Sequence, residues 1–275
     1  MHDSIAVAMS GGVDSSVAAW LLRQQGEQAV GVTMRLFVPE DLAPGQREQC
    51  HILEDLQDAR TVAGQLGIPH HTLDLSGLFR EQVMEPFVQA YEQGRTPNPC
   101  VTCNRTIKFG ALLEVAGQLG CGRLATGHYA RTERDTGSGR VLLKRGVHPE
   151  KDQSYVLWSL SQAQLERVCF PLGGLSKEEI RAIAEEQGLV SARRRDSQDI
   201  CFVPDGDYAA FLCHHTGRTY SPGPFCDPEG RVLGVHEGII HYTVGQRRGL
   251  KVSSNQGRLY VKELCPQENR VILSD

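Results

Sequence analysis

A loop rich in glycine and serine near the start of the chain has the composition of a phosphate-binding site. It covers residues 9–16 and reads Met-Ser-Gly-Gly-Val-Asp-Ser-Ser. Gly11 and Gly12 let the backbone approach an anion closely and adopt positive φ angles. The hydroxyls of Ser10 and Ser15 add donors where the next helix begins and its dipole is positive. The loop therefore predicts polyphosphate binding.

The carboxylate of Asp14 narrows the kind of phosphate site, because it would repel a phosphate unless a cation lay between them. Oxygen ligands of this kind suit Mg²⁺, so we expect Asp14 to help hold the ion indirectly. The loop lacks the Gly-Lys-Ser/Thr of a Walker A site and the G-x-G-x-x-G of dinucleotide-binding folds. The first absence excludes a Walker A loop, and the second argues against dinucleotide binding.

A second candidate for chemistry is the cysteine pair in the segment Thr96–Asn104, which reads Thr-Pro-Asn-Pro-Cys-Val-Thr-Cys-Asn. Cys100 and Cys103 could form a redox pair, half of a metal site or a nucleophilic centre. A zinc ribbon would need a second C-x-x-C pair, which the sequence lacks. We expect the start of a helix here to favour the thiolate of Cys103.

Cys201 follows the basic run Arg193–Arg195, and nearby cations stabilise a thiolate and attract phosphodiesters. The chain has nine cysteines, an odd number that does not indicate a disulfide framework in a protein of this length. The other six cysteines have apolar or scattered neighbours, which favours structural roles.

The apolar periodicity predicts strands that alternate with helices in the first half of the chain. This order is typical of a parallel sheet with helices on both faces. Beyond about Asp205 we expect a small β-rich domain made of short strands. The expected strands are 5–9, 29–37, 68–75, 123–129, 220–224, 232–235, 239–244, 259–264 and 271–273, and the expected helices are 17–26, 53–66, 79–91, 107–119, 162–168 and 177–187, with a hairpin around 135–139.

The overall charge gives little sign of nucleic-acid binding. The formal net charge is −4, although Arg193–Arg195 and Arg247–Lys251 are local basic patches. No apolar run is long enough to cross a membrane, and no secretion signal precedes the first strand. We therefore expect a cytoplasmic protein.

The motifs taken together resemble the tRNA-specific 2-thiouridylases, a bacterial family of pyrophosphate-loop enzymes. Besides the loop and the Thr-Pro-Asn-Pro-x-x-x-Cys-Asn segment, the resemblance rests on four motifs in the family's order. They are Ala-Thr-Gly-His-Tyr (125–129), Lys-Asp-Gln-Ser-Tyr (151–155), Asp-x-x-x-Ile-Cys-Phe (196–202) and His-Tyr-Thr-Val-Gly-Gln-Arg-Arg-Gly-Leu (241–250).

The resemblance implies an adenine-nucleotide α-hydrolase-like fold and a reaction on the wobble uridine of tRNA. The 2-oxygen of the uridine would be adenylated by ATP and then exchanged for sulfur supplied by a persulfide or sulfide donor protein. Cys201 would carry the persulfide, and Cys103 would be the nucleophile that closes a disulfide with it. The implied ATP-binding residues are Ala8, Met9, Ser10, Gly11, Gly12, Val13, Asp14, Ser15, Met34 and Gly127.

The resemblance also implies the contacts with tRNA. The target base would leave its stack to reach Asn98, Pro99 and Cys100. The other implied tRNA contacts are His128, Lys151, Asp152 and Gln153, although His128 can also be read as a satisfied core histidine.

Two departures from the family pattern matter. Many members have an aspartate with an acid–base role where this chain has Cys100. Cys100, Cys103 and Cys201 could instead hold a [4Fe–4S] cluster whose fourth iron binds sulfide. Both sulfur routes stay open.

The second departure lies at the C-terminus. Members usually continue into a β-barrel that helps to hold tRNA, and this sequence reaches Asp275 where that barrel would begin. We expect a catalytic domain over 1–203, with a helical extension from about 150, and a β-rich domain over 204–275. The alternatives are another adenylating enzyme that acts on a small substrate, or a non-catalytic ATP- or metal-binding protein. No sequence feature sets the oligomeric state.

Overall fold

The computed structural model describes residues 4–194, 199–252 and 257–275. By its internal contacts the chain forms two compact units that interleave along the sequence. The first unit comprises residues 1–38, 50–82 and 100–198, and the second comprises residues 39–49, 83–99 and 199–275. The predicted domain boundary after residue 203 stays a prediction.

The first unit is built on a five-stranded parallel sheet, as the alternation of strands and helices predicts. The strand order is β3-β2-β1-β4-β7. The strands are β1 (Ser4–Ala8), β2 (Ala29–Arg35), β3 (His70–Asp74), β4 (Cys121–Ala125) and β7 (Val168–Cys169).

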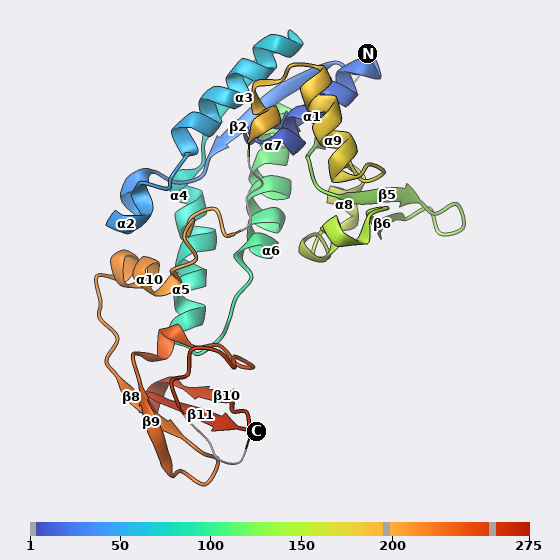
Figure 1. Cartoon of the computed structure of the whole chain (residues 1–275). Coiled ribbons are helices and arrows are strands. Elements are labelled where there is room, and N and C mark those ends of the chain that lie inside the picture. The colour runs from blue at the N-terminus through green and yellow to red at the C-terminus, as the bar shows by residue number, and fades with distance from the viewer. Residues whose placement is uncertain (1–3, 195–198, 253–256) are drawn as a thin grey trace. The chain divides into compact units, whose positions relative to one another are not determined.

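Helices cover both faces of this sheet. Alternate residues of a strand point to opposite faces, so neighbouring residues of β1 contact different helices. Ile5 and Val7 pack with α1 (Val13–Gln24), α3 (Ile52–Leu66) and α9 (Lys177–Glu186). Ala6 packs on the other side with α7 (Leu112–Gln118). Helices α1 and α9 are in contact, and Figure 1 shows them side by side. The predicted parallel sheet with helices on both faces is confirmed.

The cysteine pair lies in a longer helical segment than the one predicted from Ile107. The segment begins as α6 (Pro99–Cys103), continues as a π-helix (Asn104–Ala111) and ends as α7. Pro99 suits the first turn because a proline there leaves no helical hydrogen bond unmade.

The remaining elements of the first unit are short. They are α4 (Ser76–Phe79), the hairpin of β5 (Ala130–Arg134) and β6 (Val141–Arg145), α8 (Gln162–Leu165), and the 3₁₀ turns Pro149–Lys151, Ser154–Val156 and Val190–Arg193. The hairpin was predicted, and the predicted helix over 162–168 is shorter because Val168 joins β7.

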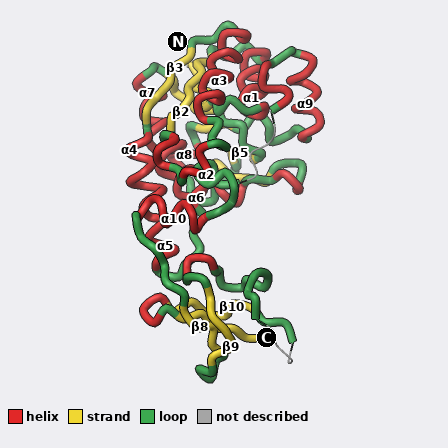
Figure 2. The backbone as a smooth tube through the Cα atoms, turned by 60° about the vertical axis from the view of Figure 1, so that its left-hand side comes forward, coloured by secondary structure: helices red, strands yellow, loops and turns green. Residues whose placement is uncertain are grey.

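The second unit contains a four-stranded sheet of order β10-β11-β8-β9, whose strands are visible in Figure 2. Its strands are β8 (Gly223–Cys226), β9 (Val232–His236), β10 (Tyr260–Cys265) and β11 (Arg270–Ser274). The pairs β10–β11 and β8–β9 are antiparallel, and β11–β8 is parallel. The short strands expected in this region are thus present, except that the expected strand 239–244 is a 3₁₀ turn over Ile239–His241.

Aromatic contacts join two helices of the second unit, α5 (Glu85–Glu92) and α10 (Tyr208–Thr216), and the sequence analysis missed α10. The short α2 (Pro44–Arg47) also belongs to this unit. The rings of Phe202 and Phe211 lie 5.3 and 6.0 Å from the ring of Phe87. Pro86 lies in the first turn of α5, directly after a π-helical turn over Arg80–Met84. Among the described residues, no helix has the length and apolarity needed to span a membrane.

Candidate functional site

The glycine- and serine-rich loop lies at the switch point of the sheet in the first unit. From β1 the chain builds β2 and β3 on one side, whereas β4 and β7 lie on the other side. In open α/β sheets, ligands bind at the carboxyl ends of the strands where the order reverses. The loop between β1 and α1 is at this position, and so is Gly127, two residues after β4.

Gly127 lies directly against the loop, as expected for one nucleotide site. A Cβ atom at Gly127 would lie 3.0 Å from the carbonyl carbon of Asp14 and 3.0 Å from the backbone nitrogen of Ser15. Met34, the other residue expected in the adenosine pocket, is the penultimate residue of the neighbouring strand β2. The predicted nucleotide residues therefore gather at one edge of the sheet.

The loop needs glycine at residue 11 for two separate reasons. Gly11 has a φ of 79°, in the left-handed region. A Cβ atom there would also lie 2.3 Å from the carbonyl oxygen of Asp55. The serines fix the rest of the turn, because the hydroxyl of Ser15 accepts the backbone N–H of Ser10 at 3.0 Å and donates to the carbonyl of Gly12 at 3.1 Å.

The carboxylate of Asp14 has two donors that the sequence analysis missed. Both Nζ of Lys177 and the hydroxyl of Tyr129 donate to Oδ1 of Asp14, each at 2.7 Å. Lys177 is only 7% exposed. It is the first residue of α9, where the helix dipole disfavours a cation. A lysine at the start of a helix is therefore a sequence signal that could have pointed to a nearby anion.

The donor set around Asp14 is compatible with the Mg²⁺ role expected for it. Both hydrogen bonds fall on Oδ1, and the carboxylate is about one-third exposed. With a nucleotide in the loop, Asp14 and the phosphates would offer the oxygen ligands that Mg²⁺ prefers. Lys177 supplies a fixed positive charge at the same place.

Cys100 and Cys103 differ sharply in exposure although only two residues separate them. Cys100 is exposed and Cys103 is buried. Burial raises the pKa of the Cys103 thiol, and the opposing effect of Lys108 is smaller. The expectation that the helix start favours this thiolate is wrong here, because Cys103 is the fifth residue of the helix and lies beyond its unbonded N–H groups.

Cys201 is exposed and belongs to the second unit, whereas Cys103 belongs to the first. The preceding residues Arg195–Gln198 lie outside the described part of the chain. Among the described residues no disulfide is formed, and no group of three or more metal-ligating side chains is arranged to hold an ion. The Cys103–Cys201 disulfide and the three-cysteine cluster therefore remain proposals.

Arg194, in the basic run, forms ion pairs with three carboxylates. Nε of Arg194 donates to Oδ2 of Asp58 at 2.7 Å, and its guanidinium also pairs with Glu54 at 3.3 Å and Asp55 at 3.7 Å. These carboxylates lie on α3 of the same unit. Arg194 thus ties the end of the 3₁₀ turn Val190–Arg193 to α3, so it is not a solvated charge.

His128 is half-buried in the first unit. Its Nδ1 lies 2.7 Å from the hydroxyl of Thr126, and its ring lies 5.9 Å from Phe109 and 6.1 Å from Phe170. Burial lowers the pKa of His128 well below its ordinary value, so the imidazole is neutral at pH 7. This environment matches the core-histidine interpretation, and a tRNA contact would have to use the neutral ring.

The Lys151–Gln153 segment also has internal partners. Asp152 accepts hydrogen bonds from the backbone of Gly146 and the hydroxyl of Ser154, and the pKa of Asp152 is lowered because these bonds outweigh the effect of burial. The side chain of Gln153 accepts the backbone N–H of Tyr129 at 3.1 Å. These contacts fix the segment against the strand end that also carries the Asp14 partner.

Comparison with known proteins covers nearly the whole chain. The model of the tRNA methyl transferase HUP domain matches residues 3–205, and that of the tRNA methyl transferase PRC-barrel domain matches residues 209–275. A tRNA-specific 2-thiouridylase of Thermoanaerobacter pseudethanolicus is 51% identical over 274 residues, covering 99% of this chain and 75% of that protein. Its counterpart from Clostridioides difficile is 43% identical over 275 residues, covering 100% of this chain and 76% of that protein.

A solved 4-thiouridine synthetase–RNA complex with bound ATP is more distant. It is 23% identical, with a TM-score of 0.43, over 74% of this chain and 46% of that chain. This similarity is too low to support a functional inference. The 51% and 43% sequence identities to the two 2-thiouridylases, over nearly the full length of this chain, establish the family. The chain belongs to the tRNA-specific 2-thiouridylase family.

Proposed function

We propose that this chain catalyses the ATP-dependent exchange of the 2-oxygen of the wobble uridine in tRNA for sulfur. The observation that carries the proposal is the match, over 99% of the chain, to relatives named for this reaction. The Gly11–Gly12 turn at the sheet's switch point supports it, because a backbone of this shape suits a nucleotide polyphosphate. A tRNA substrate also makes the cytoplasm the expected site of the reaction.

The first step makes the oxygen a leaving group. The 2-oxygen of the uridine attacks the α-phosphorus of ATP, which forms an O-adenylate and releases pyrophosphate. The loop holds the phosphates, while Lys177 and Asp14 set the charge next to them. Asp14 would help to hold Mg²⁺, which would neutralise charge on the phosphates.

The second step exchanges oxygen for sulfur. The terminal sulfur of a persulfide on Cys201 attacks carbon 2 of the base, and AMP leaves with the original oxygen. Cys103 then attacks Sγ of Cys201, so that the sulfur stays on the base and a Cys103–Cys201 disulfide remains. A thiol reductant must reduce that disulfide before the next turnover. Asn98, Pro99, Cys100, His128 and 151–153 are the proposed tRNA contacts.

The alternative sulfur route uses a [4Fe–4S] cluster on Cys100, Cys103 and Cys201 with sulfide as the donor. Measuring the iron content and thiolation activity of protein purified without oxygen distinguishes the two routes. Iron bound in proportion to protein, and lost in Cys100→Ser, would favour the cluster. Iron-free protein that thiolates with a persulfide donor would favour the persulfide.

The names of the two matched domain models suggest a second reaction, methyl transfer to tRNA. One assay distinguishes the two reactions: the protein is incubated with tRNA, Mg²⁺-ATP and a sulfur donor, and the nucleosides are analysed by mass spectrometry. Oxygen-to-sulfur exchange and methylation change the nucleoside mass by different amounts. We expect 2-thiouridine that requires ATP and appears together with pyrophosphate.

A further inference from the structure

Two aromatic side chains of the first unit are exposed on one short turn. Trp158 is 72% exposed and Tyr155 is 63% exposed, and no large hydrophobic side chain among the described residues is more exposed than Trp158. Between them in sequence, Val156 and Leu157 are buried in the core of the unit. The turn therefore has an inner side that packs and an outer side that presents both rings.

The backbone of this turn agrees with a shared direction for the two rings. Ser154–Val156 is a 3₁₀ turn, and side chains three residues apart in this geometry eclipse one another. Tyr155 and Trp158 have this spacing, and both are exposed. The carbonyl of Val156 accepts a hydrogen bond from Nδ2 of Asn104 at 3.2 Å, which attaches the turn to the helical segment of the cysteine pair.

The residue before the turn links it to the nucleotide loop. The backbone N–H of Gln153 donates to the carbonyl of Tyr129 at 2.9 Å, and Oε1 of Gln153 accepts the N–H of Tyr129 at 3.1 Å. The hydroxyl of Tyr129 in turn donates to Asp14 of the loop. All these residues belong to the first unit, so the link involves no residue of the second unit.

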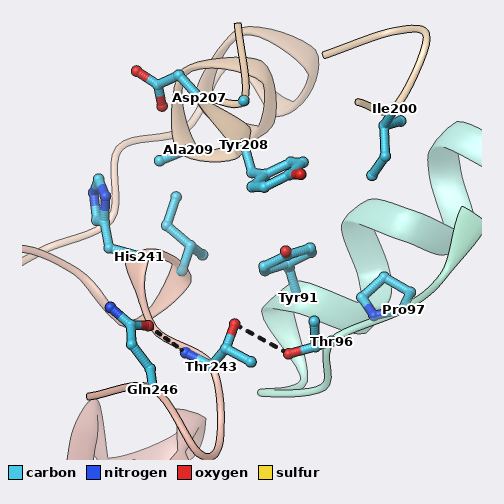
Figure 3. A pocket seen from close by; sticks show the side chains of 12 residues that line it. Tyr91, Thr96, Pro97, Ile200, Asp207, Tyr208, Ala209, His241, Thr243 and Gln246 are labelled. Atoms are coloured by element: carbon cyan, nitrogen blue, oxygen red, sulfur yellow. Dashed lines mark hydrogen bonds between the residues drawn. The ribbon is translucent and has the colours of Figure 1, made fainter. Parts of the chain in front are cut away.

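Aromatic rings in the second unit are arranged differently. Tyr91 and Tyr208 border a pocket of about 410 Å³, but they stack on each other with their centroids 6.2 Å apart, and Tyr91 is only 8% exposed (Figure 3). Each ring covers a face of the other. Neither Tyr155 nor Trp158 stacks on another ring of the described residues, so their faces are open to a ligand.

The hairpin next to this turn carries an excess of positive charge, although the chain as a whole is acidic. The formal net charge of the chain is −4, whereas residues 130–158 hold six basic and four acidic residues. The basic residues are Arg131, Arg134, Arg140, Lys144, Arg145 and Lys151. Strand β6 ends at the exposed Arg145 and is in contact with the 3₁₀ turn Ser154–Val156. Exposed rings beside cations are the combination that proteins use to bind unpaired bases and their phosphates.

We propose that Tyr155 and Trp158 form a stacking platform for an unpaired base of the tRNA. This inference rests on the proposed function, which supplies the RNA. A protein partner could also cover exposed rings, but the excess of cations around them favours an acidic ligand. Every base has a face that can stack, so the platform would add affinity for the tRNA without choosing a particular base.

Tryptophan fluorescence tests the platform directly, because the chain has only two tryptophans. Trp20 is half-buried on α1, and Trp20→Phe leaves Trp158 as the single emitter. The emission of this variant and its quenching by acrylamide are measured with and without wobble-uridine tRNA. We expect bound tRNA to lower the emission and to lower the acrylamide quenching constant toward that of a buried tryptophan. Unchanged quenching at saturating tRNA would overturn the proposal.

Affinity measurements give the size of the effect. Trp158→Leu should weaken tRNA binding by about 5- to 150-fold, which is the usual effect of one lost base–aromatic stack. Trp158→Phe keeps a ring and should lose less. Leu53→Ala changes an exposed apolar residue of α3 and should leave the affinity unchanged. Equal affinities for Trp158→Leu and the parent chain would contradict the platform.

The salt dependence distinguishes stacking from a disturbed surface. Trp158→Leu removes no phosphate contact, so the slope of log K against log salt should equal that of the parent chain. A smaller slope would mean that the variant lost charge contacts, and it would contradict stacking as the cause. ATP binding checks that the first unit is folded. If either variant does not fold, acrylamide quenching of the parent chain with and without tRNA decides, because its exposed tryptophan is Trp158.

The same measurements separate this inference from the proposed function. A parent chain that neither binds nor thiolates tRNA would contradict the thiolation proposal. A parent chain that thiolates tRNA while Trp158 stays accessible would contradict the platform alone. Shielding of Trp158 by a sulfur-donor protein, and not by tRNA, would also overturn the platform and would assign this surface to protein docking.

Discussion

Nζ of Lys177 donates a hydrogen bond to Oδ1 of Asp14 across 2.7 Å, and this buried lysine is the first residue of α9. Asp14 lies in the nucleotide loop, so the pair links the loop to a helix that follows it by 163 residues in sequence. Under the proposed function, this contact would balance a cation next to the phosphates against a carboxylate next to Mg²⁺. The pair should therefore affect both stability and the ion dependence of ATP binding.

Lys177→Met should lower the free energy of unfolding by about 1–3 kcal/mol. The change leaves the partly buried Asp14 carboxylate with only the hydroxyl of Tyr129 as donor. Because the Asp14 carboxylate is partly exposed, the loss of stability should be smaller than that for a fully buried ion pair. Urea unfolding measures the loss. Lys262→Met is the matched control because Lys262 is exposed, and it should change stability by no more than about 0.5 kcal/mol. Equal losses in both variants would refute a role for the pair.

The same Lys177→Met variant should bind ATP roughly 10- to 100-fold more weakly without Mg²⁺, because the positive charge that faces Asp14 next to the phosphate site is lost. Saturating Mg²⁺ should restore part of this loss, since the ion can neutralise Asp14 in place of the lysine. Calorimetric titration with and without the ion measures both effects. A loss of the same size under both conditions would mean that Lys177 acts only as a structural residue.

Gly11→Ala should abolish ATP binding, whereas Gly26→Ala should preserve it. Both glycines have a φ near 80°, so alanine costs each about 1–2 kcal/mol of backbone strain. Only at Gly11 would the new Cβ also collide with the backbone of Asp55, whereas nothing lies within 4 Å at Gly26. Comparing ATP affinity in the two variants separates the shape of the loop from general strain. Retained affinity in Gly11→Ala would contradict the assignment of the loop.

Cys103 should react with iodoacetamide more slowly than Cys100 at neutral pH, because burial raises the pKa of the Cys103 thiol and hinders access to it. A raised thiol pKa means that the reactive thiolate accumulates only at higher pH, so labelling of Cys103 should continue to rise above the ordinary thiol pKa. Peptide mapping by mass spectrometry measures each site. Labelling of Cys103 as fast as that of Cys100 at pH 7 would show that its thiol is already accessible and activated.

Arg247→Gln should reduce the salt dependence of tRNA binding. Losing one phosphate contact lowers the slope of log K against log salt by about 0.7–0.9. The slope of Arg193→Gln is measured for comparison, because Arg193 is an exposed arginine of the other basic patch. Titrations at several salt concentrations give the slopes. An unchanged slope in Arg247→Gln would exclude this arginine from the phosphate contacts.

The fold of the first unit could be predicted because its signals are local. Alternating apolar runs and glycine stops define the strands and helices, and the capping box of Ser176 with Glu179 marks the start of α9 as the structure shows. The errors lie where tertiary packing overrides the pattern. The apolar stretch at 239–244 reads as a strand, but Ile239 and Ile240 are buried in a 3₁₀ turn. Helix α10 was missed for a similar reason. Its sequence has no clear helical periodicity of apolar residues, and it is held by the packing of Phe211 against Phe87 of α5.

The site was only partly predictable. Short motifs locate the loop, Gly127 and the cysteines, because their chemistry needs particular residue types. The Lys177–Asp14 and Tyr129–Asp14 contacts join residues more than 100 positions apart, which no local pattern encodes. The surroundings of Cys103 were misjudged because its burial depends on the packing of the whole unit.

A thiolation assay tests the central claim most directly. The chain, Cys103→Ala and Cys201→Ala are each incubated with wobble-uridine tRNA, Mg²⁺-ATP and a persulfide donor, and 2-thiouridine and pyrophosphate are quantified together. The account predicts that the parent chain forms 2-thiouridine, with one pyrophosphate released for each base thiolated. It predicts no 2-thiouridine from either variant. No 2-thiouridine from the parent chain, or undiminished 2-thiouridine from both variants, would contradict it.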